Sequence, residues 1–168
     1  MNAGLLLLHA FLGAGLVAHG LQKLLVFRLS GTAAYVDSLG LRAPRLMAGA
    51  VIGSELAGGT LVGLGLLLPL GAALIAATML VAARTDHRGK GWFITGAGAE
   101  YVATNAIVAL ALAGAGGGRY SLDHALSLHL RGVDWAGAVL IASVVAATAI
   151  LGTFRHRPLV TAAPESAA

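Results

Sequence analysis

Two glutamates are the residues in this sequence with the clearest potential for chemistry. Glu55 and Glu100 lie in the apolar stretches 46–68 and 93–113, neither of which contains another acidic residue. A carboxylate at membrane depth is energetically expensive, so such residues commonly bind ligands or carry protons. The alternative is structural, because a protonated or lysine-paired carboxyl can hold neighbouring helices together. Both interpretations stay open for both residues.

Further titratable side chains lie close to these stretches. His87 belongs to a short polar loop, and its imidazole titrates near neutral pH, so it could pass protons to a buried carboxylate. Lys23 and His19 lie near the end of the first apolar run, where a lysine commonly extends its ammonium group to the interface. The candidate catalytic residues are therefore Glu55, Glu100 and His87, and the candidate cofactor-binding residues are Lys23 and His19.

Other kinds of site are disfavoured by residue type and spacing. No Glu-x-x-His spacing occurs, so we predict no metal cage. The chain has no cysteine, which excludes disulfides, thiolate nucleophiles and cysteine-ligated clusters on this chain. No phosphate-binding loop, serine-hydrolase motif or dinucleotide motif stands in a suitable context. Any redox reaction must therefore draw its electrons from a substrate, a bound cofactor or a partner protein.

Composition indicates a membrane protein. Hydrophobic residues make up 58% of the 168 residues and charged residues 11%, and the mean hydropathy is +0.85. Soluble domains carry about 25% charged residues, so the expected environment is a lipid bilayer. The net charge of +4 comes from loop lysines and arginines without interleaved aromatic residues. It indicates membrane orientation and anionic lipid rather than a nucleic-acid partner.

Five apolar stretches are candidates for membrane-spanning helices, each of which needs roughly 20 residues. They are residues 3–26, 46–68, 70–83, 93–113 and 135–154. The second and third are joined almost directly at Pro69, which predicts a tight helical hairpin. The expected fold class is all-α, a polytopic bundle of transmembrane helices. We expect a four-helix domain in 1–132, an additional span in 133–155 and a disordered cytoplasmic tail in 156–168.

Lysines and arginines are unevenly distributed over the loops between these spans. Nine follow spans one, three and five, whereas only Arg119 and Arg131 lie on the alternate side. Because cytoplasmic loops carry the excess of positive charge, we expect the N-terminus outside and the C-terminus in the cytoplasm. A helical rise of about 1.5 Å per residue then puts Glu55 about 15 Å and Glu100 about 10 Å deep from the cytoplasmic side.

Capping signals predict short helices in two of the loops. In the first loop, Thr32 is expected to cap a helix that stops at Gly40, and Pro44 suits the first turn of the next span. On the other side, Ser121 is expected to cap a helix over 122–130. Both segments are therefore expected to lie along the membrane interface rather than to extend into water.

Small residues at four-residue spacing recur along the apolar stretches. Gly49 with Gly53, and Gly59 with Gly63, are examples. Such spacing lets helix backbones approach closely. It favours a helical bundle without selecting a particular pair of helices.

Several of these residues stand in short motifs that resemble the DoxX family of small bacterial membrane proteins. The resemblance covers roughly residues 3–123. It rests on Lys23, on Glu55 within 53–59, on the run 78–83 leading to His87, Trp92 and Phe93, on Gly98-Ala-Glu-Tyr101, and on Gly118-Arg-Tyr-Ser-Leu-Asp123. It implies a four-helix bundle in the bacterial cytoplasmic membrane, with matching polar positions at Lys23, Glu55, His87, Glu100 and Asp123. The fifth span departs from the typical four-span pattern.

The resemblance also implies a link to redox processes. Relatives include a membrane subunit of thiosulfate:quinone oxidoreductase. Others are linked to a membrane complex with superoxide dismutase and a thiosulfate sulfurtransferase that resists oxidative stress. The implied partners are therefore the lipid bilayer and soluble redox enzymes of these kinds, with quinone as a candidate cofactor, and a homo-oligomer stays open.

Three functions fit this combination of features. In the leading hypothesis a quinone or similar lipophilic molecule enters between spans, and Glu55, Glu100 and His87 bind it or handle its protons. In the second, the chain is a non-catalytic scaffold whose basic loops dock soluble partners. The third is a small proton-coupled transporter, which needs a continuous polar path, and the outer half offers little beyond His9 and Asn105.

Overall fold

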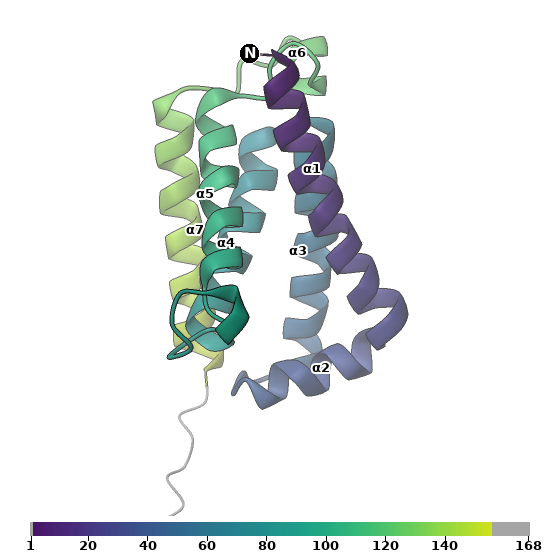
Figure 1. Cartoon of the computed structure of the whole chain (residues 1–168), viewed down its shortest axis with the longest axis vertical. Helices are drawn as coiled ribbons and strands as arrows, with labels where there is room; N and C mark the ends of the chain where they lie inside the picture. The colour runs from purple at the N-terminus through teal and green to yellow at the C-terminus, as the bar shows by residue number, and fades with distance from the viewer. Residues whose placement is uncertain (1, 156–168) are drawn as a thin grey trace, which may run out of the picture.

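The computed structural model describes residues 2–155, which form helices without a β-sheet in that range (Figure 1). In chain order the elements are α1 (Asn2–Leu21), the π-helix η1 (Gln22–Phe27), α2 (Arg28–Ser38), α3 (Pro44–Leu64), α4 (Leu68–Thr85), the 3₁₀ turn η2 (Ile94–Gly96), α5 (Glu100–Ala115), α6 (Leu122–Ala125) and α7 (Val133–Phe154). Four helical segments in this range are long and apolar enough to cross a membrane, and α5 is a shorter apolar helix. The predicted all-α polytopic bundle is confirmed.

The long helices stand side by side, with α4 at the centre (Figure 1). α1 packs against α3, α3 packs against α4, and α4 also contacts α5 and α7. Residues Ala72, Ile75 and Met79 of α4 are buried in one apolar core that all these helices share. The N-terminus, the α3–α4 hairpin and α6 lie at one end of the bundle, here called the α6 end. α2, the loop 86–99 and the end of α7 lie at the other end, here called the α2 end.

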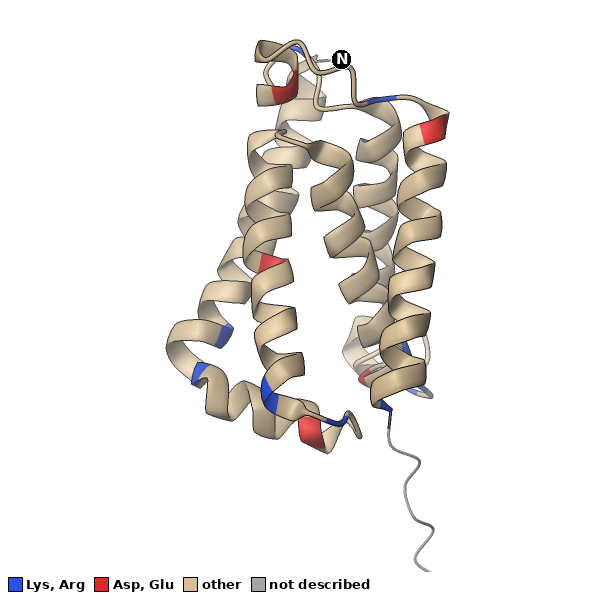
Figure 2. Ribbon diagram, turned by 180° about the vertical axis from the view of Figure 1, so that it is seen from behind, with Lys and Arg blue, Asp and Glu red and all other residues tan. Residues whose placement is uncertain are grey.

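Charge and apolar surface are separated along the bundle. Lysine, arginine and acidic residues gather mainly at its two ends (Figure 2). Between the ends, large apolar side chains point outward, and Phe11, Ile107 and Ile141 are 84%, 64% and 66% exposed. Apolar surface of this extent needs lipid around it. The chain is therefore an integral membrane protein.

The first span continues directly into α2 instead of ending before a separately capped helix. α1 passes through η1, and the chain turns at Arg28, whose φ is 58°. α2 then lies across the end of the bundle (Figure 1). The predicted N-cap at Thr32 is wrong, because Thr32 is buried inside α2. Its hydroxyl donates a hydrogen bond of 3.3 Å to the carbonyl oxygen of Lys23 in the π-helix η1.

The α3–α4 hairpin follows the proline and glycine signals of the sequence. Pro44 stands in the first turn of α3 and Pro69 in the first turn of α4, where a missing amide hydrogen costs nothing. Gly65 ends α3 in the left-handed region with φ of 60°. α4 is 18 residues long, so it is longer than the predicted stretch 70–83.

The fourth span begins later than predicted. Residues 93–99 form a loop around η2, and α5 begins at Glu100. The loop is compact, since a Cβ atom at Gly98 would lie 2.4 Å from the carbonyl carbon of Trp92. Glu100 therefore lies in the first turn of a helix at the α2 end. The predicted start of this helix at residue 93 is wrong, and the depth of about 10 Å for Glu100 is counted from that start.

The segment between α5 and α7 is only partly as predicted. Ser121 caps α6, and its hydroxyl oxygen accepts a hydrogen bond of 3.2 Å from the His124 amide. The helix is one turn long rather than extending over 122–130, and the chain leaves it through Ser127, whose φ is 56°. The apolar helix predicted at 135–154 is confirmed as α7. The tail predicted to be disordered, 156–168, lies outside the described residues.

Candidate functional site

A cavity of about 500 Å³ lies in the half of the bundle toward the α2 end. Residues of α1, α3, α4, α5 and α7 form its walls, and α2 lines it from the end of the bundle. Most of the lining is apolar. The polar lining residues are His19, Lys23, Thr32, Tyr35, Ser54, Glu55, Thr78, Thr85, Asp86, His87 and Tyr101. Such a cavity suits a molecule with an apolar body and a small polar part.

An ion pair between α3 and the end of the first span lies in the cavity wall. The Lys23 ammonium donates to both carboxylate oxygens of Glu55, at 2.9 Å and 2.8 Å. The Glu55 side chain is 6% exposed, whereas that of Lys23 is 22% exposed. Glu55 is the only acidic residue of α3, and Lys23 is its one cationic partner among the described residues. The π-helix η1 carries Lys23, and π-helical turns occur frequently at functional sites.

Two hydroxyl groups form a second polar point in the wall. Ser54 Oγ of α3 and Thr78 Oγ1 of α4 are 2.8 Å apart. Thr78 also lies 2.8 Å from the Leu74 carbonyl oxygen, to which its hydroxyl donates. Because each hydroxyl also has acceptor lone pairs, this pair can accept a hydrogen bond from a ligand in the cavity.

Charged and hydrogen-bonding residues surround the cavity at the α2 end. The Tyr35 hydroxyl of α2 donates to Asp86, and Lys90 Nζ lies 3.0 Å from the same carboxylate. Partial burial raises the pKa of Asp86, but the hydrogen bonds from Tyr35 and Lys90 outweigh it and leave that pKa below its ordinary value. Asp86 is therefore ionised at neutral pH. His87 Nδ1 lies 2.7 Å from the Ala97 carbonyl oxygen, which joins the two ends of the loop 86–99.

Part of this arrangement falls within a known protein family. The DoxX family model matches residues 4–88, half of the chain. The chain belongs to the DoxX family. The match runs from α1 to the loop after α4, and it includes Lys23, Glu55 and His87. No curated protein and no solved structure matches the chain.

Four of the five predicted site residues of this DoxX-family chain line the same cavity. These are Lys23, His19, Glu55 and His87. His19 also lies against Tyr101 of α5, with ring centroids 5.8 Å apart, so α1 and α5 meet at this wall. Among the described residues, no group of three or more histidines, cysteines and acidic residues is arranged to hold a metal ion.

Glu100 is the predicted site residue that does not line the cavity. Its carboxylate accepts a hydrogen bond of 2.9 Å from the Ile94 amide, and its own amide donates to the Trp92 carbonyl oxygen at 2.8 Å. These bonds join the first turn of α5 to the preceding loop. Glu55 and Glu100 therefore do not line one cavity, although the leading hypothesis has both residues act on the same bound molecule.

Four further polar residues of the cavity were not singled out from the sequence. Ser54 and Thr78 are small hydroxyl residues within apolar helices, and such residues commonly bond only to their own helix. Tyr35 and Asp86 lie in two different segments that the sequence predicts to be loops between spans. They meet only because α2, which carries Tyr35, lies across the end of the bundle. The adjacency of Ser54 to Glu55 and that of Asp86 to His87 were the signals that could have identified two members of this set.

Asp123 stabilises the α6 end of the bundle through hydrogen bonds to the backbone. Its carboxylate accepts hydrogen bonds from the amides of Leu67 at 2.7 Å and Leu68 at 3.0 Å, and the residue is 5% exposed. It thereby satisfies amides at the start of α4 that have no partner within the helix. The conformation of the α3–α4 hairpin therefore depends on a side chain from α6.

Replacing Asp123 by asparagine should destabilise the protein by about 1.5–3 kcal/mol, because one charge-assisted hydrogen bond to a buried amide is lost. Reversible unfolding in detergent, followed by circular dichroism, measures this change. Asp134→Asn is the matched control, since Asp134 is exposed in the first turn of α7. A loss no larger than that of the control would show that the α3–α4 hairpin does not need Asp123.

Proposed function

We propose that this chain is a redox-associated membrane subunit that binds a quinone, or a similar lipophilic molecule with a polar head, in the cavity toward the α2 end. The observation that carries the proposal is the combination of a large apolar lining with the buried Lys23–Glu55 ion pair. Ligand sites commonly join an apolar cleft of about 300–1,000 Å³ to a few polar groups that fix the ligand's orientation. A quinone ring has apolar faces and two carbonyl oxygens, which match such a lining.

The polar residues take separate roles in the proposed site. The Lys23 ammonium donates to a quinone oxygen, and Glu55 holds that ammonium in place and exchanges a proton with the bound molecule. His87 and Asp86, at the α2 end of the cavity, pass protons between Glu55 and water. Reduction of a quinone to a quinol takes up two electrons and two protons. Since the chain has no cysteine-ligated centre, the electrons come from a substrate such as thiosulfate or from a partner enzyme.

Charge distribution supports an orientation for this site. The α2 end carries the exposed basic residues Arg28, Arg42, Arg45, Arg84, Arg88 and Lys90. Following the positive-inside pattern, the α2 end faces the cytoplasm of a bacterial cell, with the N-terminus outside. The proposed site is then close to cytoplasmic redox enzymes, such as a sulfurtransferase or a superoxide dismutase.

Filling the cavity should abolish quinone binding without removing a charge. Ala77 lines the cavity, so a phenylalanine there occupies space that the ligand needs. We expect Ala77→Phe to weaken binding of a short-chain ubiquinone at least tenfold, measured by titration calorimetry in detergent. Ala142→Phe is the matched control, because Ala142 is exposed on α7 and does not line the cavity. Equal affinity of the two folded variants contradicts binding in this cavity.

Turnover tests the redox part of the proposal. Thiosulfate-dependent quinone reduction is measured for the wild type, Glu55→Gln and Glu100→Gln, each checked for folding. Glu55→Gln should lose activity and Glu100→Gln should keep it, because Glu100 lies outside the cavity. A wild type that binds no quinone overturns the direct redox role.

A non-catalytic scaffold is the second candidate function. The observation in its favour is the set of exposed basic residues at the α2 end, which could attract an acidic soluble partner. In that case charge-neutralising substitutions at Arg84, Arg88 and Lys90 remove partner capture, and Ala77→Phe has no effect. Transport has less support, since neither His9 nor Asn105 lines the cavity.

A further inference from the structure

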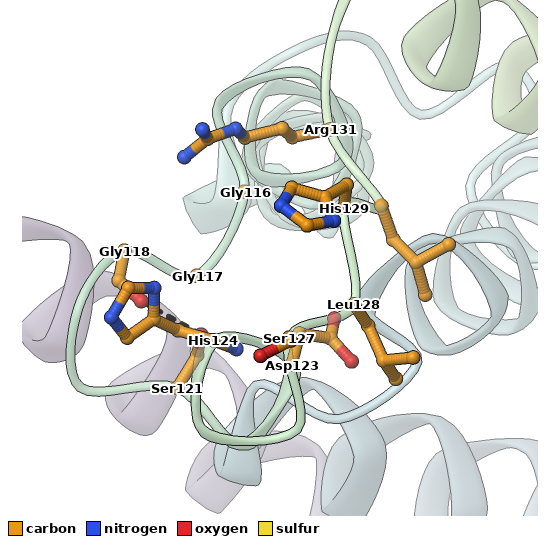
Figure 3. Close-up of a pocket in the computed structure, with 11 residues that line it drawn as sticks. Gly116, Gly117, Gly118, Ser121, Asp123, His124, Ser127, Leu128, His129 and Arg131 are labelled. Carbon is orange, nitrogen blue, oxygen red and sulfur yellow. Dashed lines mark hydrogen bonds between the residues drawn. The ribbon is translucent and has the colours of Figure 1, made fainter.

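A second pocket lies at the α6 end, on the opposite side of the bundle from the quinone cavity proposed above. It has a volume of about 190 Å³. It is formed by the glycine run 116–118, by Ser121, Asp123 and His124, and by residues 127–131 (Figure 3). The side chains of His124, His129 and Arg131 are arranged around the same hollow (Figure 3). The pocket therefore collects one permanent cation and two side chains that become cationic on protonation.

The one acidic residue in this pocket is already engaged. Asp123 uses its two carboxylate oxygens to accept hydrogen bonds from the amides of Leu67 and Leu68. By contrast, Arg131 has no carboxylate within 4 Å among residues 2–155, where the ion pairs are Lys23–Glu55 and Lys90–Asp86. The charge available to a ligand in this pocket is therefore positive.

The glycine run allows Arg131 and the backbone to come close together. A Cβ atom at Gly116 would lie 3.1 Å from Cβ and 3.4 Å from Cδ of Arg131, so the arginine stem lies directly against this glycine. The amides of Gly117 and Gly118 donate to no acceptor in the described part of the chain. Backbone amides and a guanidinium are the donors that oxyanions prefer in proteins.

A metal ion does not fit the same residues. No group of three or more histidine, cysteine and acidic side chains in the described range is arranged to hold one, although two histidines and an aspartate line this pocket. An anion is the ligand that matches a free guanidinium, two imidazoles and unpaired amides. The pocket volume exceeds that of a single phosphate group, so it also admits part of a larger molecule that carries one.

We propose that the pocket at the α6 end binds a phosphate-type oxyanion, either free in solution or in the headgroup of a membrane lipid. Arg131 is the principal ligand, and His129 is a second donor. The site is independent of the quinone cavity, because the two pockets share no lining residue. Its occupation fixes the segment between α5 and α7 and thereby the position of Asp123 against the hairpin.

The test compares two arginines of the same segment in the full chain. Arg131→Gln removes the principal ligand, whereas Arg119→Gln removes an exposed charge that does not line the pocket. Inorganic phosphate is titrated calorimetrically into protein in a neutral maltoside detergent. Bound phosphatidylglycerol is counted by native mass spectrometry after reconstitution. We expect Arg131→Gln to weaken phosphate binding or lipid retention about tenfold, as the loss of one charge-assisted hydrogen bond implies, and Arg119→Gln to leave both within twofold.

The outcomes separate the sources of the anion. Phosphate binding that depends on Arg131 identifies a free oxyanion, and lipid retention that depends on Arg131 without phosphate binding identifies a headgroup; both support the site. A wild type that binds neither overturns the proposal, and so do equal losses in the Arg131 and Arg119 variants. His129→Gln is the second variant, used in case Arg131→Gln does not fold. His129 is exposed, and its replacement should weaken phosphate binding or lipid retention by a smaller factor than Arg131→Gln.

Discussion

Replacing Lys23 by glutamine is expected to lower the free energy of unfolding by about 3–5 kcal/mol, because the substitution leaves a buried carboxylate without its cation. The Glu55 side chain is 6% exposed and has no other charged partner in the described structure. Glu55→Gln should cost less, about 1–3 kcal/mol, because the Lys23 side chain is 22% exposed and can extend toward water. The double variant should recover part of the loss, since neither charge is then left alone.

The second ion pair of the described residues provides the control. Lys90 and Asp86 are 3.0 Å apart, but their side chains are 44% and 26% exposed. Solvent screens such a pair, so Lys90→Gln should change stability by no more than about 1 kcal/mol. Reversible unfolding in mixed micelles, followed by circular dichroism, measures all four variants under one condition. If Lys23→Gln costs no more than Lys90→Gln, the buried pair is not a main determinant of stability.

This comparison also decides how Glu55 acts at the proposed site. In the structural interpretation the carboxylate only balances Lys23, so quinone binding follows the folded fraction of each variant. In the functional interpretation the folded fraction of Glu55→Gln has lost affinity, because the amide can neither hold the ammonium in place nor exchange a proton. Stability alone does not distinguish the structural from the functional interpretation. Quinone binding measured per folded molecule does.

The helices that cross the membrane could be predicted from the sequence because their signals are local. An apolar run of adequate length is helical in a bilayer, since every backbone polar group must be satisfied within the segment. Pro44 and Pro69 mark helix starts for an equally local reason, because proline suits a first turn. Ser121 caps α6 as predicted, since the hydrogen bond that it accepts comes from an amide three residues on.

The start of α5 could not be predicted in the same way. Residues 93–99 are apolar enough to extend a span, and hydropathy does not separate an apolar loop from an apolar helix. The loop conformation depends on Gly98 packing against the backbone of Trp92 and on Glu100 accepting from the Ile94 amide. Both contacts become visible only when the segment is folded back on itself, so residue counting from position 93 starts seven residues before the helix does.

The cavity depends on the rotation of each helix, which sequence spacing does not fix. The depth of Glu55 follows from counting residues, but the direction in which it points follows from the partner it meets. Lys23 faces Glu55 because η1 changes the helical period just before α2 turns across the bundle. A π-helix has no reliable sequence signal, so the sequence supports the ion pair only as one of several alternatives for Glu55.

The second large effect is expected where α1 and α3 cross. A Cβ atom at Gly13 would lie 2.3 Å from the Gly63 Cα atom and 2.5 Å from the Gly59 carbonyl oxygen. Both obstacles are backbone atoms, so no side-chain movement can relieve them. Gly13→Ala should therefore destabilise the protein by more than about 3 kcal/mol, above the usual range for overpacking. Thermal unfolding in detergent checks this expectation.

Gly63→Ala is the matched control on the facing helix. A Cβ atom at Gly63 would lie 3.5 Å from the Gly13 Cα atom, which is an ordinary contact, and alanine favours the helix. The same contact should set the geometry of the proposed site, because α3 carries Glu55 and α1 leads directly into η1, which carries Lys23. Gly13→Ala should then reduce quinone binding in proportion to its loss of folded protein, and Gly63→Ala should not. Equal stability of the two variants would mean that α1 and α3 move apart at little cost, and that the Lys23–Glu55 pair rather than glycine packing sets their separation.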